Sequence, residues 1–262
     1  MANHKKMTSM FLRNPHLNGS TFFLQGANDI GLLLLHGFTA TTVEVSYLAK
    51  FLNERGYTVS APLLPGHNTT PDDLNKCKWQ DWASAAEAAY HALAVRYKKI
   101  IVGGESMGAM LALYLASEHP EIIGVLTYAP SLITPSSSRA WQVKILSWFK
   151  TYLPKPHRPP NLTDGRTKSY TVNPLKAVTQ FHDLQDETRR RLPRVTQTLL
   201  NIQGRLDMVI DPRNGEVILQ EVKSAYKEMH WLEHSTHVLI LDQEWERAAE
   251  LTLNFIRKIE RL

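Results

Sequence analysis

The sequence predicts an α/β fold in which a mostly parallel, doubly wound sheet carries a small helical cap inserted after the sixth strand. Short apolar runs alternate with helix-forming segments over residues 21–128, as expected for strands buried on both faces and joined by right-handed crossovers. The alternation stops at Pro130 and resumes at Thr196. Between one apolar run and the helical segment after it lies a glycine-flanked serine, GESMG, at residues 104–108.

Seven short segments rich in Ile, Leu, Val and aromatic residues predict the strands. Turn-forming residues bound the first segment, which we interpret as an edge strand. The second is apolar throughout, which is typical of a central strand with both faces covered. In chain order the predicted strands cover residues 21–24, 30–35, 57–61, 100–102, 122–128, 196–203 and 227–233.

Segments with apolar residues three to four positions apart predict the helices between these strands. Thr41 and Glu44 have the spacing of a capping box, in which each side chain binds the other residue's backbone N–H. Gly56 suits the position just beyond the end of that helix. The predicted helices cover residues 41–55, 79–96, 109–116 and 244–259, and a further helix begins at Asp211-Pro212.

Residues 131–193 interrupt the alternation and predict a cap, or lid, within a single domain that spans residues 1–262. The segment is rich in proline and contains no run that predicts a buried strand. Two amphipathic stretches, residues 136–152 and 174–192, predict helices instead. The first carries several large aromatic residues, so we expect one of its faces to be covered or to cover something. An irregular surface excursion is the alternative interpretation.

Composition is that of an ordinary soluble protein and argues against several functional classes. The chain has 262 residues, 43% of them hydrophobic and 21% charged, and a net charge of +5. Its longest basic run, residues 189–191, is typical of a solvated helix face rather than a nucleic-acid site. The single cysteine, Cys77, allows no internal disulfide and is a poor candidate for catalysis. Without a signal peptide or a transmembrane stretch, we expect a cytoplasmic monomer or weak homodimer with no stable membrane insertion.

The motif at residues 104–108 predicts a nucleophile elbow. A strand before and a helix after this motif hold the serine in a sharp, strained turn that lifts its Oγ above the sheet. Gly104 and Gly108 fit because larger side chains two residues before and after the serine would collide. Ser106 is therefore the candidate nucleophile, and an incidental serine in a glycine-rich turn is the alternative.

A serine nucleophile needs a base that accepts its proton and an acid that orients the base. In this architecture the acid follows the next-to-last strand and the histidine follows the last one. Of the two acids available, Asp211 precedes a proline and suits a helix N-cap, so Asp207 is the candidate acid. Spacing does not distinguish His234 from His237 as the base.

Two backbone N–H groups are expected to bind the negative oxygen that develops during the reaction. Met107, directly after the nucleophile, supplies one, and Phe38 supplies the other, with Gly37 allowing the loop to turn. This chemistry needs no cofactor and no metal, and His91 and His119, within and at the end of helices, look structural. The residues that we expect to line the substrate pocket, although the valines would equally suit the core, are Gly37, Trp141, Ile145, Val209 and Val238.

Taken together, these segments resemble the α/β-hydrolase superfamily, and more closely bacterial carboxylesterases and monoacylglycerol lipases with a small lid. The resemblance identifies His237 as the base and implies the α/β-hydrolase fold. The sequence departs mildly from the family pattern at Ala109 and Asn68, where glycine is common in the family. The lid is the segment that matches the family least. The matching segments are LLLLHGFT at 32–39, PGH at 65–67, GESMG at 104–108, Asp207 with its following helix, and STHVLILD at 235–242.

The resemblance implies a serine carboxylesterase that hydrolyses short- to medium-chain carboxylic esters through an acyl-enzyme on Ser106. Its partner would be a small-molecule ester and not a nucleic acid. Monoacylglycerol lipase or thioesterase activity on the same triad is an alternative, and a non-catalytic ligand-binding module of the same fold is an alternative of another class. A long-chain lipase is disfavoured because nothing in the sequence indicates a large exposed interfacial face.

Overall fold

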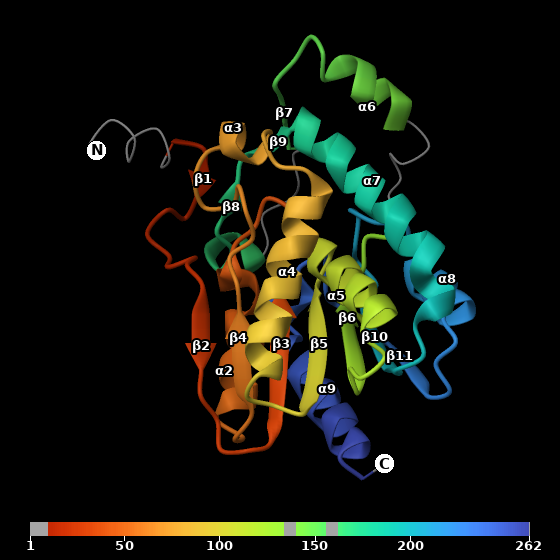
Figure 1. Cartoon of the computed structure of the whole chain (residues 1–262). Coiled ribbons are helices and arrows are strands. Elements are labelled where there is room, and N and C mark those ends of the chain that lie inside the picture. Colours follow the sequence, from red (N-terminus) through yellow and green to blue (C-terminus); the bar gives the residue numbers. More distant parts are fainter. Residues whose placement is uncertain (1–9, 134–139, 156–161, 262) are drawn as a thin grey trace.

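A seven-stranded sheet forms the centre of the computed structural model, which describes residues 10–133, 140–155 and 162–261. The strands lie in the order β11-β10-β6-β5-β3-β4-β2 (Figure 1). Only the edge strand β2 is antiparallel, pairing with β4, and the other pairs are parallel. The strands of this sheet are β2 (Phe22–Leu24), β3 (Ile30–Leu35), β4 (Thr58–Ala61), β5 (Lys99–Glu105), β6 (Gly124–Tyr128), β10 (Thr198–Gly204) and β11 (Lys227–Leu232).

Helices cover both faces of the sheet (Figure 1). Apolar residues of α4, α5, α7 and α8 pack into the core on one face, and those of α2 and α9 pack into the core on the other. No helix of the described residues is long and apolar enough to span a bilayer. The helices are α2 (Ser46–Asn53), α3 (Pro71–Leu74), α4 (Trp79–Ala94), α5 (Met107–Glu118), α6 (Ala140–Leu146), α7 (Leu175–Arg191), α8 (Asn214–Glu221) and α9 (Trp245–Ile259).

The central strand β3 shows why the sheet is doubly wound. All six of its residues are buried. Leu33 and Leu35 pack into the core that contains α4 and α5, whereas Ile30, Leu32 and Leu34 pack into the core that contains α2 and α9. A strand covered on both faces needs an apolar residue at every position. The predicted α/β architecture is confirmed.

Two helix starts differ from the prediction. Thr41 precedes a 3₁₀ turn (Thr42–Val45) and makes no capping hydrogen bond with its side chain. The expected capping box is therefore wrong, because Glu44 turns inward and accepts a hydrogen bond from the Gly37 N–H in the loop that precedes the turn. Asp211 is not the N-cap of α8, which begins at Asn214; its carboxylate instead accepts a hydrogen bond from the Arg213 N–H at 2.9 Å.

The segment between β6 and β10 leaves the sheet and carries α6 and α7 at the end of the sheet where α5 begins (Figure 1). The expected helix over 174–192 is confirmed as α7. The helix expected over 136–152 is shorter, because α6 ends at Leu146, and residues 134–139 lie outside the described part. The segment also contains short antiparallel strands, which the prediction of helices missed. These strands are β7 (Tyr152–Pro154) paired with β9 (Val172–Pro174), and β8 (Ser169–Tyr170) paired with β1 (Leu12–Arg13).

Helix α5 approaches β3 so closely that only glycine fits at two positions. A Cβ atom added at Gly104 or Gly108 would lie less than 3.0 Å from backbone atoms, including the carbonyl oxygen of Leu35 in both cases. Real Cβ atoms essentially never come that close to backbone, and backbone cannot swing aside as a side chain can. This close approach sets the position of the turn between β5 and α5.

We expect Gly108→Ala to lower the free energy of unfolding by about 1–3 kcal/mol, because the new methyl group would push α5 away from β3. Gly165→Ala is the matched control, since a Cβ at Gly165 would meet nothing within 4 Å, and its effect should stay within about 0.5 kcal/mol. Urea denaturation measures both. Equal stability of the two variants would contradict the close approach.

Candidate active site

Ser106 lies at the carboxyl end of β5, where the chain turns sharply into α5. Its backbone has a φ of 55° and a ψ of −110°, a conformation that strains any residue other than glycine. Its N–H donates a hydrogen bond to the Tyr128 carbonyl oxygen at 2.9 Å, which ties the turn to β6. The strained elbow expected from the sequence is therefore present, with its side chain at the carboxyl edge of the sheet.

Loops after the last two parallel strands bring a histidine and an acid to this serine. His237 Nε2 lies 3.0 Å from Ser106 Oγ. The other ring nitrogen, His237 Nδ1, lies 2.7 Å from Asp207 Oδ2. An ionised carboxylate only accepts hydrogen bonds, so Nδ1 carries a proton and Nε2 is left to accept one from the serine hydroxyl. This is the arrangement that proton transfer from a serine requires.

The environment of Asp207 favours its charged form. Burial by itself raises the pKa of a carboxyl group, but the charge of His237 and its hydrogen bond oppose that effect. The Val209 N–H also donates to Asp207 Oδ1 at 2.7 Å, and the Ile210 N–H donates at 3.3 Å. Together these interactions hold the pKa of Asp207 below its ordinary value. Asp207 is therefore a carboxylate beside the imidazole.

The alternative acid and base lie elsewhere. Asp211 forms an ion pair with the Arg213 guanidinium at 2.7 Å, and this pairing lowers the pKa of Asp211 to about 2. His234 is exposed, and its N–H donates to Glu244 Oε2 at 2.8 Å. The structure thus brings together Ser106, Asp207 and His237 and leaves these two apart.

The loop after β3 passes directly beside the serine. A Cβ atom added at Gly37 would lie 3.3 Å from the Ser106 Cβ. Phe38 follows in this loop, and Met107 is the first residue of α5. Among the described residues, no group accepts a hydrogen bond from the N–H of Phe38 or Met107. Within that part of the chain, both donors are free to bind a ligand.

Glu44 holds this loop in place. It is buried, and its Oε2 accepts a hydrogen bond from the Gly37 N–H at 2.5 Å. Burial raises the pKa of Glu44 to about 7, although the Gly37 hydrogen bond and the charges of His237 and Lys155 oppose that rise. Sequence reasoning assigned this side chain to a helix cap and missed its position beside the site.

Two buried histidines fasten the same loop to the loop after β4. His36 Nε2 accepts a hydrogen bond from the Leu64 N–H, and His67 Nε2 accepts one from the Thr39 N–H, each at 3.1 Å. Burial lowers the pKa of His36 to about 4 and that of His67 well below its ordinary value. Both rings are therefore neutral acceptors that set the path of the loop.

Ser131 also contacts the nucleophile and was missed by sequence reasoning. Its Oγ lies 2.8 Å from Ser106 Oγ, and its carbonyl oxygen accepts a hydrogen bond from Gln185 Nε2 at 2.5 Å. Gln185 belongs to α7, so this contact joins the segment between β6 and β10 to the site. Its position in the sequence could have identified it, because Ser131 follows β6 and so lies at the carboxyl edge of the sheet with the other site residues.

The residues expected in the substrate pocket fall into two groups. Gly37, Val209 and Val238 lie in the loops that carry the site, and Val209 is half-buried against the core. Trp141 and Ile145 lie on α6 and are 62% and 45% exposed. Their contact with a substrate stays a prediction.

As the pH rises from about 4.5 to about 7, we expect the free energy of unfolding of the wild-type protein to fall relative to that of the Glu44→Gln variant. The folded pKa of Glu44 is about 7, above its ordinary 4.5, so between these values the folded state binds more protons than the unfolded state. The loss should be on the order of 3 kcal/mol. Glutamine keeps an acceptor for the Gly37 N–H. Denaturant midpoints across this pH range measure the difference, and parallel curves would contradict the buried carboxyl.

Comparison with known proteins places this geometry in a family. The family described as serine aminopeptidase, S33, matches residues 26–244. A thermostable monoacylglycerol lipase of Bacillus sp. (strain H-257) is 31% identical over 249 residues, which cover 93% of this chain and 97% of that protein. A carboxylesterase of Bacillus subtilis (strain 168) is 29% identical over 233 residues, covering 88% and 94%.

Solved structures agree on the fold. A structure from work on LipS and LipT, two metagenome-derived lipolytic enzymes, is 32% identical with a TM-score of 0.86, covering 92% of this chain and 98% of that one. The monoacylglycerol lipase of Paleococcus ferrophilus is 18% identical with a TM-score of 0.78, covering 93% and 100%. The chain therefore belongs to the serine aminopeptidase S33 family of α/β hydrolases and is a hydrolytic enzyme.

Proposed function

We propose that the protein is a serine carboxylesterase that hydrolyses short- to medium-chain carboxylic esters through an acyl-enzyme on Ser106. The observation that carries this proposal is the continuous series of contacts from Ser106 Oγ through the His237 ring to Asp207. The relatives named carboxylesterase and monoacylglycerol lipase support esters as the substrate class.

In the first step, His237 Nε2 takes the hydroxyl proton of Ser106 while Oγ bonds to the acyl carbon of the ester. Asp207 keeps the ring oriented and stabilises the imidazolium that forms. The N–H groups of Phe38 and Met107 donate to the oxygen that becomes negative. The alcohol then leaves with the proton from His237, and the acyl group stays on Ser106.

In the second step, His237 takes a proton from water while the water oxygen bonds to the same acyl carbon. The bond to Ser106 Oγ breaks, the serine regains its proton from His237, and the carboxylic acid leaves. No cofactor takes part in either step of this proposal. We further propose that residues 131–193 act as the lid over the site, and that the enzyme works in the cytoplasm as a monomer or weak homodimer.

The surface of α6 favours a second candidate function, monoacylglycerol hydrolysis. Trp148 and Phe149, in the turn that follows α6, are 73% and 79% exposed, and Trp141 on α6 is 62% exposed. Exposed aromatic residues in one place are unusual for a surface that meets only water. Nothing in the sequence indicated a large interfacial face, but these exposed aromatic residues favour a substrate presented in a lipid aggregate.

Ser106→Ala should reduce kcat for p-nitrophenyl butyrate by about 10⁴-fold or more, because no other group in the proposal can carry the acyl chain. The assay follows release of p-nitrophenol from wild type and variant at equal concentration. Retained esterase turnover in the variant would sink the assignment of the nucleophile.

Two further variants test the acid against a matched control. Asp207→Asn should lower kcat by about 10³–10⁴-fold, since the amide no longer holds the required ring tautomer. Asp211→Asn removes a carboxylate four residues away that pairs with Arg213 instead, and it should leave kcat within a few-fold of wild type. The reverse order would mean that the two acids were assigned wrongly.

The two candidate functions differ in their dependence on the α6 patch. If aggregated monoacylglycerols are substrates, Trp148→Ser should raise KM severalfold for long-chain monoacylglycerol and leave hydrolysis of soluble butyrate esters unchanged. Phe23→Ser, which changes an aromatic residue that is 44% exposed on β2, is the control. An acyl-length series of both ester types measures this, and equal effects of the two variants would reject the second function.

A further inference from the structure

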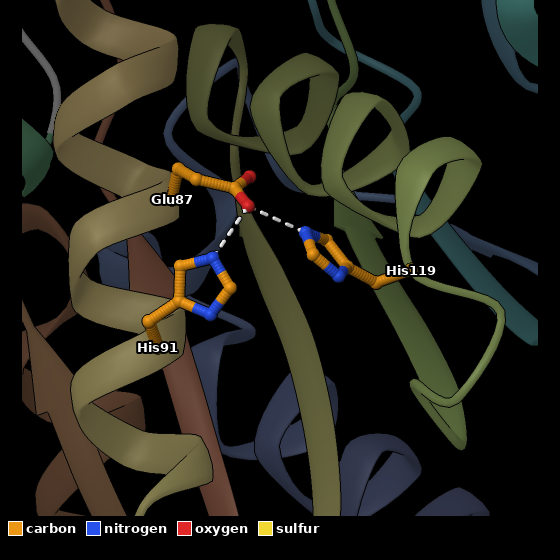
Figure 2. A group of neighbouring side chains, drawn as sticks. All are labelled: Glu87, His91 and His119. Carbon is orange, nitrogen blue, oxygen red and sulfur yellow. Dashed lines mark hydrogen bonds and ion pairs between the residues drawn. The ribbon is translucent and has the colours of Figure 1, made fainter.

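Three side chains that can bind a metal converge on the face of the sheet that α4 and α5 cover. Glu87 and His91 lie four residues apart on α4 and so project from one side of that helix. His119 follows directly after α5. Figure 2 shows both imidazole rings turned toward the carboxylate of Glu87. His91 Nε2 lies 3.0 Å and His119 Nε2 lies 2.6 Å from Glu87 Oε1.

These separations are close to those of a coordination sphere. The three ligand atoms all lie within 4.8 Å of one another. Ligands at about 2.0–2.1 Å from a tetrahedral Zn²⁺ are about 3.3 Å apart. To admit an ion, the His91 nitrogen would move away from Glu87 Oε1 by about 0.3 Å and the His119 nitrogen by about 0.7 Å. Two imidazoles and a carboxylate are a donor set that suits Zn²⁺ and neighbouring divalent transition metals.

The hydrogen bonds around His119 prepare its Nε2 as a ligand. On the far side of the ring, His119 Nδ1 lies 3.1 Å from Glu121 Oε1. Tyr90 donates its hydroxyl proton to the same oxygen at 2.7 Å. Because a carboxylate only accepts, the contact with Glu121 places a proton on Nδ1, and Nε2 is the nitrogen that would coordinate an ion. A carboxylate behind a histidine is the usual outer partner of a metal-bound imidazole.

The surroundings leave room for the remaining ligands. Glu87 and His119 line a surface hollow of about 340 Å³, together with Tyr114 and Ser84. Water molecules in this hollow would complete the coordination. The His119 side chain is 15% exposed, whereas that of His91 is 60% exposed. His119 is thus the largely buried member of the set, and His91 is the exposed one.

We propose that Glu87, His91 and His119 bind a divalent transition metal such as Zn²⁺. The ion would link α4 to the chain between α5 and β6 and stabilise the fold. It would take no part in ester hydrolysis, because Ser106 and His119 lie at opposite ends of α5, whose 12 residues span about 18 Å. The sequence led us to expect a structural role for His91 and His119, and the proposal specifies that role as binding a stabilising metal ion.

Binding of ZnCl₂ to the EDTA-treated, dialysed full-length protein tests the proposal, by calorimetric titration and by thermal melting. We expect one site per chain in wild type and a rise in Tm with added Zn²⁺. His91→Gln and His119→Gln should each weaken that binding at least tenfold and remove the rise in Tm. Glu121→Gln should weaken it about 10–100-fold through loss of the outer partner.

His230→Gln is the matched control, since His230 pairs with a single glutamate, Glu228, at 2.9 Å outside the cluster. It should bind Zn²⁺ as wild type does. Because His91 is largely exposed, His91→Gln should keep its metal-free Tm, which separates loss of a ligand from loss of the fold. Equal Zn²⁺ affinity in wild type and His119→Gln, or an equal loss in His230→Gln, would overturn the site. Neither readout depends on the proposed esterase activity.

Discussion

The contact between α5 and β3 is the constraint on which the candidate active site depends. With glycine at positions 104 and 108, the helix approaches the Leu35 carbonyl more closely than any side chain would allow. The chain can then turn within one residue, which leaves Ser106 with a strained backbone and its Oγ at the carboxyl edge of the sheet. The loops after β3, β10 and β11 begin at that same edge. Each of them can therefore contribute one group to the serine without any long excursion.

Three neighbouring acids near the site have pKa values shifted in different directions by their surroundings. The carboxyl group of Glu105 is buried near the backbone N–H groups of Leu239 and Ile240, which act to lower its pKa. Burial and the nearby charges of Glu44 and Asp207 raise its pKa well above the ordinary value. The pKa of Glu44 is also raised, whereas His237 and backbone N–H groups lower the pKa of Asp207. The acid that contacts the imidazole thus keeps its charge, and its neighbours are driven toward the neutral form, as in enzymes that use environment to assign roles.

Sequence reasoning succeeded where a local pattern has one physical solution. The apolar runs and the glycine pair around Ser106 predict the sheet and the elbow. Asp207 does contact His237, but the N-cap role by which Asp211 was set aside is wrong, because α8 begins at Asn214. Sequence reasoning could not separate His234 from His237, because both lie in one loop and only tertiary packing turns one ring toward Ser106. Glu44 was misassigned because it lies three residues after Thr41, the spacing of a capping box. That spacing does not reveal that its side chain binds the Gly37 N–H instead. An amphipathic pattern likewise predicts an apolar face on α6 but not what covers it.

The most direct test of the central claim is the site of modification by an alkyl fluorophosphonate, located by peptide mass spectrometry. Ser131 makes this test sharp, because its hydroxyl lies only 2.8 Å from that of Ser106 and offers the reagent an alternative target. Our account predicts a single adduct on Ser106 that is absent in Ser106→Ala and forms far more slowly in His237→Ala. An adduct on Ser131, or labelling that does not depend on His237, would contradict it.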